Sequence, residues 1–156
     1  MIKFIADSML GRLAKWLRLI GYDTLYFRDI EDSLLLRIAR EEQRVLLTRD
    51  TRIVKVRGLG QHLLLSYNDP FEQLKEVVDS LDLMRKGETP TLHSRCAVCN
   101  GTLADITKEH ALGHVPEYVF ETSLSFRRCM QCSRLYWKGT HTDRIDNKLS
   151  EILKET

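Results

Sequence analysis

The residues whose chemistry is easiest to identify in this sequence are four cysteines, which form two pairs of Cys-x-x-Cys spacing. The pairs are Cys96 with Cys99 and Cys129 with Cys132, and the sequence contains no other cysteine. Each two-residue gap lets a tight turn direct both thiolates at one ion, and the 29 residues between the pairs can form a β excursion that returns to close a tetrahedral zinc site. Two disulfides, or a pair of redox motifs, are the alternatives. A zinc ion with four thiolate ligands has no open position for water, so the predicted site is structural and catalysis must come from elsewhere.

Aspartates at the ends of predicted strands form a second informative set. Asp7 and Asp50 each follow a short apolar segment, and the carboxyl ends of parallel strands gather functional groups at one edge of a sheet. Asp32, at the start of a predicted helix, can supply a third carboxylate. Neighbouring carboxylates repel unless a divalent cation neutralises them, and oxygen ligands without histidine favour Mg²⁺ or Mn²⁺, ions that promote phosphodiester cleavage. The alternative is that these residues, with Asp29, are turn formers or helix caps.

Length and composition place the chain among globular proteins. Its 156 residues, 43% hydrophobic and 29% charged, can bury one core and one small module that a metal stabilises. The first residues reach charges at Asp7 and Arg12, so they predict neither a signal peptide nor a membrane span, and we expect a cytoplasmic protein without a membrane partner. A net charge of +2 is too small to indicate nucleic-acid binding by itself.

The distribution of arginine and aromatic residues is more informative than the net charge. Arg12, Arg18 and Arg49 are predicted beside the acidic site, where guanidinium groups can make bidentate contacts with phosphate, although Arg18 could equally lie along its helix. Four residues beyond the second cysteine pair combine stacking faces with positive charge: Tyr136, Trp137, Lys138 and His141. Such residues can hold single-stranded bases with little sequence preference. The alternative is that one of the two aromatic residues packs over the zinc site.

The elements that position these residues alternate between strand and helix. Short apolar runs predict strands over residues 2–6, 22–27, 44–48 and 62–66. Helical periodicity predicts helices over residues 9–19, from 32 to about 42, and from 70 to 81, with Asp32 and Ser33 capping the second of them. Alternation of strand and helix indicates a parallel sheet covered on both faces.

A polar segment over residues 86–90, with glycine and proline, is the best candidate for a domain boundary. It predicts an N-terminal α/β domain over residues 1–85, a linker over 86–94 and a zinc-ribbon domain over 95–156. Within the ribbon domain we expect short strands between the cysteine pairs, including residues 118–120, a strand over 134–138 and a closing helix over 143–154.

Several segments of the chain resemble the Mut-seven C-terminal RNase domain family. They are FIADSMLGRLAKWLRLIGYD over residues 4–23, DxxLLxxA over 32–39, RVLLTRD over 44–50, RCxxCN over 95–100 and CxxCxxYWxGxH over 129–141. The last two are similar to the zinc ribbon that the family carries. The resemblance implies a PIN-like nuclease fold, with a small parallel sheet between helices, and a metal-dependent RNase activity. It also implies that Asp7, Asp32 and Asp50 are the metal-binding, catalytic set.

These observations predict an α/β protein, in which a PIN-like parallel sheet flanked by helices precedes a small four-cysteine zinc ribbon. The predicted function is a metal-dependent ribonuclease for single-stranded RNA, with carboxylates holding Mg²⁺ or Mn²⁺ for phosphodiester hydrolysis, a structural Zn²⁺ and a ribbon that assists RNA binding. The alternative is a non-catalytic RNA-binding module whose acidic site is too sparse to cut. A phosphoacceptor receiver domain fits poorly, because it requires an acidic pair after the first strand and Asp7 stands alone.

Overall fold

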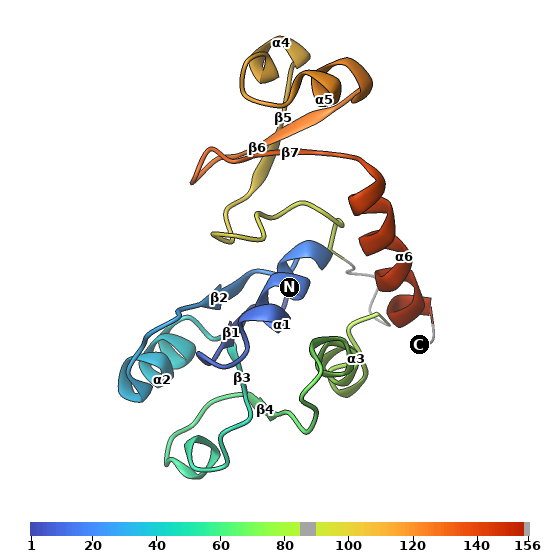
Figure 1. The fold of residues 1–156 in the computed structure, drawn as a ribbon. Helices are drawn as coiled ribbons and strands as arrows, with labels where there is room; N and C mark the ends of the chain where they lie inside the picture. The colour runs from blue at the N-terminus through green and yellow to red at the C-terminus, as the bar shows by residue number, and fades with distance from the viewer. Residues whose placement is uncertain (85–89, 155–156) are drawn as a thin grey trace.

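The computed structural model describes residues 1–84 and 90–154, which form a parallel α/β part, a small antiparallel sheet and a long final helix (Figure 1). Four parallel strands lie in the order β2-β1-β3-β4. Their bounds are β1 Phe4–Ala6, β2 Thr24–Tyr26, β3 Val45–Thr48 and β4 His62–Leu64. Helices α1 (Gly11–Ile20) and α3 (Pro70–Ser80) cover one face, whereas α2 (Asp32–Glu41) and the 3₁₀ turn η1 (Ile53–Lys55) cover the other. The predicted parallel sheet with helices on both faces is confirmed.

The alternation of side chains along each strand divides the core into two clusters. Phe4 and Ala6 belong to the cluster beneath α1 and α3, whereas Ile5 joins Leu35 and Leu46 beneath α2. All five side chains are buried. Because both faces of the sheet are covered, its strands appear in the sequence as continuous apolar runs instead of alternating ones.

The ends of α1, α2 and α3 show where capping residues in the sequence were sufficient to predict a helix boundary. Helix α3 begins as predicted, since the Asp69 carboxylate accepts hydrogen bonds from the next two free amides of the first turn. The predicted capping of α2 by Asp32 and Ser33 is wrong, because Glu31 has the extended backbone of the N-cap position and Asp32 is already helical. Helix α1 ends at Gly21, whose φ of 111° is accessible to glycine at little cost.

The second sheet contains three antiparallel strands in the order β5-β6-β7. These are β5 (Leu103–Ile106), β6 (Phe126–Cys129) and β7 (Leu135–Trp137). Two short helices, α4 (Lys108–Ala111) and α5 (Glu117–Thr122), separate β5 from β6. The strand predicted over residues 118–120 is wrong: this segment lies in α5, where Val119 packs in a small cluster with Ala111 and Phe126. A short apolar run does not distinguish a strand from a helical turn by periodicity.

Helix α6 (Thr140–Lys154) runs from the antiparallel sheet back to the parallel part and lies beside α3 (Figure 1). Leu149 and Ile152 of α6 are buried in the same cluster as Leu74 and Val78 of α3. The division into domains at residues 86–94 stays a prediction, and residues 85–89 lie outside the described part of the chain. None of the helices described combines the length and the hydropathy that a bilayer crossing requires.

Candidate functional site

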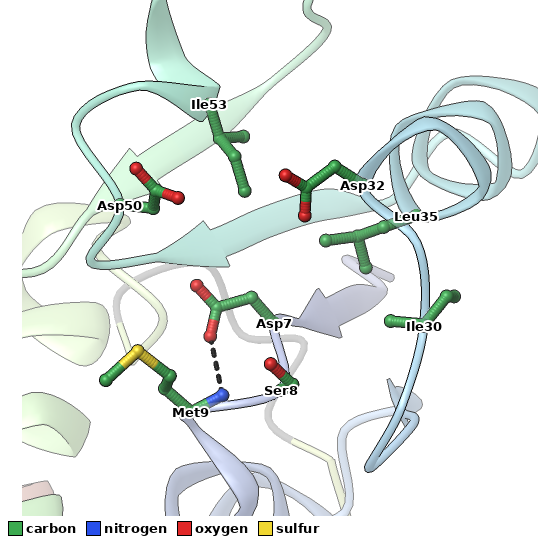
Figure 2. Close-up of a pocket in the computed structure, with 8 residues that line it drawn as sticks. All are labelled: Asp7, Ser8, Met9, Ile30, Asp32, Leu35, Asp50 and Ile53. Carbon is green, nitrogen blue, oxygen red and sulfur yellow. Dashed lines mark hydrogen bonds between the residues drawn. The ribbon is translucent and has the colours of Figure 1, made fainter.

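Asp7, Asp32 and Asp50 line one small cavity at the carboxyl edge of the parallel sheet (Figure 2). Asp7 follows β1, Asp50 follows β3 and Asp32 is the first residue of α2. The chain leaves β1 towards β2 and leaves β3 towards β4, so the strand order reverses between β1 and β3. Open parallel sheets bind ligands at such a switch point. The cavity of about 70 Å³ has room for an ion with some of its water, at about 30 Å³ per water molecule.

Asp7 is held in a defined orientation. Its side chain is buried, with 6% exposed, and its Oδ1 accepts a hydrogen bond of 2.9 Å from the amide of Met9 (Figure 2). Its Oδ2 accepts a hydrogen bond of 2.6 Å from the hydroxyl of Thr48. Because each carboxylate oxygen can accept two hydrogen bonds, both oxygens can take a further ligand. Asp7 therefore forms a turn with the residues that follow it and also presents acceptor positions to the cavity.

Thr48 links the two aspartates that follow strands. The register pairs Ala6 with Leu47, so Asp7 and Thr48 are neighbours in the next row of the sheet. The Thr48 hydroxyl donates to Asp7 and accepts a hydrogen bond of 3.0 Å from the amide of Asp50. Sequence reasoning missed this residue. The available signal was a hydroxyl at the end of an apolar strand, two residues before an aspartate.

Asp50 is paired with an arginine at the rim of the cavity. Its Oδ1 accepts a hydrogen bond of 2.8 Å from the amide of Arg52 and lies 3.3 Å from that residue's Nε. Hydrogen bonds from the Arg52 backbone and side chain hold the pKa of Asp50 below its ordinary value. The Arg52 side chain is almost fully exposed, so this ion pair is weak and another anion can replace the carboxylate.

The three carboxylates share the cavity, but their oxygens do not converge on one point. Metal ligands in proteins are commonly His, Cys, Asp and Glu side chains. Within residues 1–84 and 90–154, the four cysteines are the one group of three or more of these side chains whose ligand atoms all lie within 4.8 Å of one another. Mg²⁺ commonly retains several water molecules and uses one or two carboxylates. The donor set therefore fits a hydrated divalent ion better than an ion that all three carboxylates contact directly.

The four cysteines lie together with their sulfur atoms facing one another. The Cys96 and Cys132 Sγ atoms are 3.7 Å apart, those of Cys99 and Cys129 are 3.4 Å apart, and all four fall within 4.8 Å. Zn–S bonds of about 2.3 Å in a tetrahedron place the sulfurs about 3.8 Å apart. All four cysteines are free, so the disulfide alternative does not describe this structure. The cluster can bind one zinc ion.

Tyr136 faces the cysteine cluster, whereas its neighbour Trp137 is exposed. The Tyr136 hydroxyl lies 2.8 Å from Cys96 Sγ. Burial opposes ionisation of Cys96, but the hydrogen bond with Tyr136 and those from backbone amides outweigh it and lower the pKa of this thiol to about 7. Burial raises the pKa of Cys99 to about 12. One of the two aromatic residues thus packs on the cysteine cluster, which was the alternative to stacking on RNA.

Arg18 docks the first cysteine pair onto α1. Its side chain is buried, and its Nε donates a hydrogen bond of 2.8 Å to the carbonyl of Thr24. Its Nη1 donates to the carbonyls of Ala97 at 3.0 Å and Val98 at 3.2 Å. Burial lowers the pKa of this guanidinium, and nearby thiols and Asp23 oppose the shift. This placement does not match the predicted phosphate contact, because the donors point at the backbone between the cysteines.

A second polar cluster fixes the same junction. The Asn100 Oδ1 accepts a hydrogen bond of 2.9 Å from the amide of Thr24, and its Nδ2 donates one of 2.8 Å to Asp23. Asp23 also pairs with Arg44 at 2.7 Å. Burial opposes the charge on Asp23, but hydrogen bonds from Arg44 and Asn100 outweigh it and hold the pKa below its ordinary value of 3.8.

The other predicted contacts with RNA lie in two places. Arg12 is exposed in the first turn of α1, near the cavity-lining Met9. Arg49 is half-buried beside Asp50, and its Nη1 donates to the side chain of Asn68. Three exposed residues lie instead on the ribbon and the start of α6: Trp137, Lys138 and His141. Figure 1 shows that β7 and the parallel sheet are in different parts of the molecule, so the structure does not bring these three residues to the acidic cavity.

A family model described as the Mut7-C RNAse domain matches residues 2–149. The match covers nearly the whole chain and includes the three aspartates of the cavity and the four clustered cysteines. No curated protein and no solved structure matches the chain.

Proposed function

Because the chain belongs to the Mut7-C RNAse domain family, we propose that it is a metal-dependent ribonuclease acting on single-stranded RNA. The main support is that Asp7, Asp32 and Asp50, from three separate segments, line one cavity where the strand order reverses. The parallel sheet with helices on both faces supports a PIN-like assignment of residues 1–85, with residues 95–156 as the ribbon domain.

The residues that would hold Mg²⁺ or Mn²⁺ are Asp7, Asp32 and Asp50, directly or through water. Such an ion supplies Lewis-acid activation of water and neutralises charge that develops on the phosphate. The chain itself fixes the orientation of Asp7 through two hydrogen bonds, before any substrate binds. Thr48 sets the position of Asp50 relative to Asp7. The exposed guanidinium of Arg52 can move from the Asp50 carboxylate to a phosphate and balance its negative charge.

The ribbon has a structural metal and a supporting role in this proposal. Zn²⁺ with four thiolate ligands has no open position for a reacting group, so it stabilises the fold around the cysteines. Trp137, Lys138 and His141 are exposed and remain candidates for contacts with RNA. We assign Tyr136 to the zinc centre, because its hydroxyl lies against Cys96.

One observation favours a second candidate function, a non-catalytic RNA-binding module. The three carboxylates do not bring their oxygens within 4.8 Å of one another, and a site that never contracts around an ion would bind RNA without cutting it. The two functions differ in their response to added Mn²⁺.

The test is cleavage of labelled single-stranded RNA during a titration with Mn²⁺ or Mg²⁺. We expect the parent protein to cleave the RNA. The cleavage rates of Asp7→Asn and Asp50→Asn should be lower than the parental rate by a factor of at least about 10². The matched control is Asp105→Asn, which changes an exposed carboxylate of the ribbon and should leave the rate unchanged. Cleavage by Asp7→Asn at the parental rate would contradict the nuclease assignment. RNA binding without cleavage at any ion concentration would support the non-catalytic module.

A further inference from the structure

Exposed aromatic residues follow the two outer strands of the parallel sheet, on either side of the inner strands that Asp7 and Asp50 follow. Phe27 directly follows β2, and Tyr67 follows β4 by three residues. β2 and β4 are the outer strands of the sheet, whereas Asp7 and Asp50 follow the two inner strands. Phe27 is 38% exposed and Tyr67 is 49% exposed. Single exposed aromatic residues are common on protein surfaces, and what distinguishes these two is their position at the ends of the outer strands.

Tyr67 is exposed on a backbone that other side chains hold in place. The buried side chain of Gln73 donates a hydrogen bond of 2.8 Å to the carbonyl of Tyr67. Glu76 accepts a hydrogen bond of 3.0 Å from the amide of the preceding residue. The next residue, Asn68, accepts a hydrogen bond from Arg49. These contacts hold the backbone that carries Tyr67 in a defined position beyond the end of β4, next to the strand that Asp50 follows.

Phe27 occupies the corresponding position on the other side of the cavity. The register pairs Ala6 with Tyr26, so Asp7 and Phe27 are the next neighbours along these two strands. The hydroxyl of Tyr26 donates a hydrogen bond of 2.9 Å to the carbonyl of Ser8 and ties the end of β2 to the turn that holds Asp7. The backbone of Phe27 is therefore about one strand spacing, 4.8 Å, from that of Asp7.

The same edge carries arginines among its carboxylates and has a suitable width. Arg12, Arg28 and Arg52 are exposed near the ends of the strands. Three strand spacings place the outer strands about 14 Å apart, which is the span of a few nucleotides. A strand of RNA that crosses the edge would meet an aromatic ring, the carboxylates and a second ring in turn.

Building on the proposed ribonuclease function, we propose that single-stranded RNA crosses this edge with one base stacked on Phe27 and another on Tyr67. The phosphate between them then lies at the cavity of Asp7 and Asp50. Paired bases in a duplex do not present free faces to either ring, so the two rings select single-stranded RNA. Because every base has a π-face, this selection carries little sequence preference.

The test is binding of a short fluorescent oligouridine, measured by anisotropy. Ca²⁺ replaces Mg²⁺ and Mn²⁺ in the buffer, and RNA integrity is checked on a gel. Phe27→Ala and Tyr67→Ala should each weaken binding about 5- to 150-fold, the range observed when one stacking residue is removed. Tyr67→Phe keeps the ring and should retain parental affinity. The Tyr118 side chain is 69% exposed on α5, which belongs to the ribbon and not to the parallel sheet. The Tyr118→Ala variant should therefore also bind with parental affinity.

Abasic RNA separates stacking from a general effect on the fold. It keeps the phosphates, so its affinity should be the same for Tyr67→Ala as for the parent, and circular dichroism checks that both proteins are folded. Parental affinity of both alanine variants for base-bearing RNA, or equal affinity for duplex and single-stranded RNA, would overturn the inference whatever the cleavage assay shows. Weaker binding by the variants without cleavage in Mn²⁺ would support the inference and overturn the proposed nuclease activity.

Discussion

Replacing Thr48 by valine removes one hydroxyl and keeps the shape of the side chain, so it tests how the two strand-end aspartates are held. The hydroxyl donates to Asp7 Oδ2 at 2.6 Å and accepts from the Asp50 amide at 3.0 Å, and Thr48 is fully buried. A hydrogen bond to a charged group contributes about 1.5–3 kcal/mol and a neutral one about 0.5–1.5 kcal/mol. We therefore expect Thr48→Val to lower the free energy of unfolding by about 2–4 kcal/mol.

The matched variant is Thr48→Ser, which keeps the hydroxyl and loses one methyl group. It should cost about 1 kcal/mol. Urea unfolding followed by circular dichroism measures both variants. A double-mutant cycle of Thr48→Val with Asp7→Ala should give a coupling energy of about 1–3 kcal/mol. If the site cleaves RNA, Thr48→Val should also be about 10- to 100-fold slower than Thr48→Ser, because it leaves the carboxylate without its orienting partner.

Equal stabilities of the valine and serine variants would refute this reasoning, and so would a coupling energy near zero. Either result would mean that the hydroxyl does not fix Asp7 in solution. The orientation of the carboxylate would then depend on the bond to the Met9 amide alone.

Three further predictions concern the ribbon and its junction with the parallel part. Elemental analysis of the reduced protein should find one zinc per chain, and Cys129→Ser should lose that zinc and loosen the ribbon first; intact thiols without zinc would contradict the metal centre. Since the pKa of Asp23 lies below its ordinary value of 3.8, its stabilising effect is present above that pH and is lost as the pH falls further. Urea midpoints of the parent should thus fall more steeply below about pH 4 than those of Asp23→Asn, and parallel curves would contradict this. Gly21→Ala should cost about 1–3 kcal/mol or more, because φ is 111° and a Cβ would lie 2.4 Å from a backbone carbonyl oxygen. Gly113 also has a positive φ, 78°, but nothing lies near its Cβ position, so Gly113→Ala measures the cost of the backbone conformation without a steric clash. Equal losses of unfolding free energy in the two variants would show that the structure relieves the clash at Gly21.

The sequence was sufficient to predict that Asp7 and Asp50 share one edge of a sheet. Each follows a buried strand, and parallel strands end together, so no long-range information was needed. The distance between their oxygens could not be predicted in the same way. It depends on side-chain torsions, on the bond from Thr48 and on the pairing of Asp50 with Arg52.

Arg18 shows why the contacts between the two parts were not predictable. An arginine on a helix can face solvent, phosphate or carbonyl groups, and its sequence neighbours do not distinguish these environments. Its partners Ala97 and Val98 are 79 and 80 residues away. Helix α6 presents the same difficulty, because its amphipathic pattern indicates a buried face without identifying the surface that Leu149 covers.

The packing of α6 on α3 has a consequence for folding during synthesis. The ribosome releases α3 well before Leu149, with about 65 residues between the end of the α/β part and that leucine. At about 5–20 residues per second, the apolar surface around Leu74 and Val78 lacks its final cover for about 3–13 s. The cysteines of the ribbon emerge within that interval. If the cysteines capture zinc in that interval, the ribbon that leads into α6 is already folded when Leu149 emerges, and a shortage of zinc would prolong the time for which this surface is open to chaperones or to aggregation.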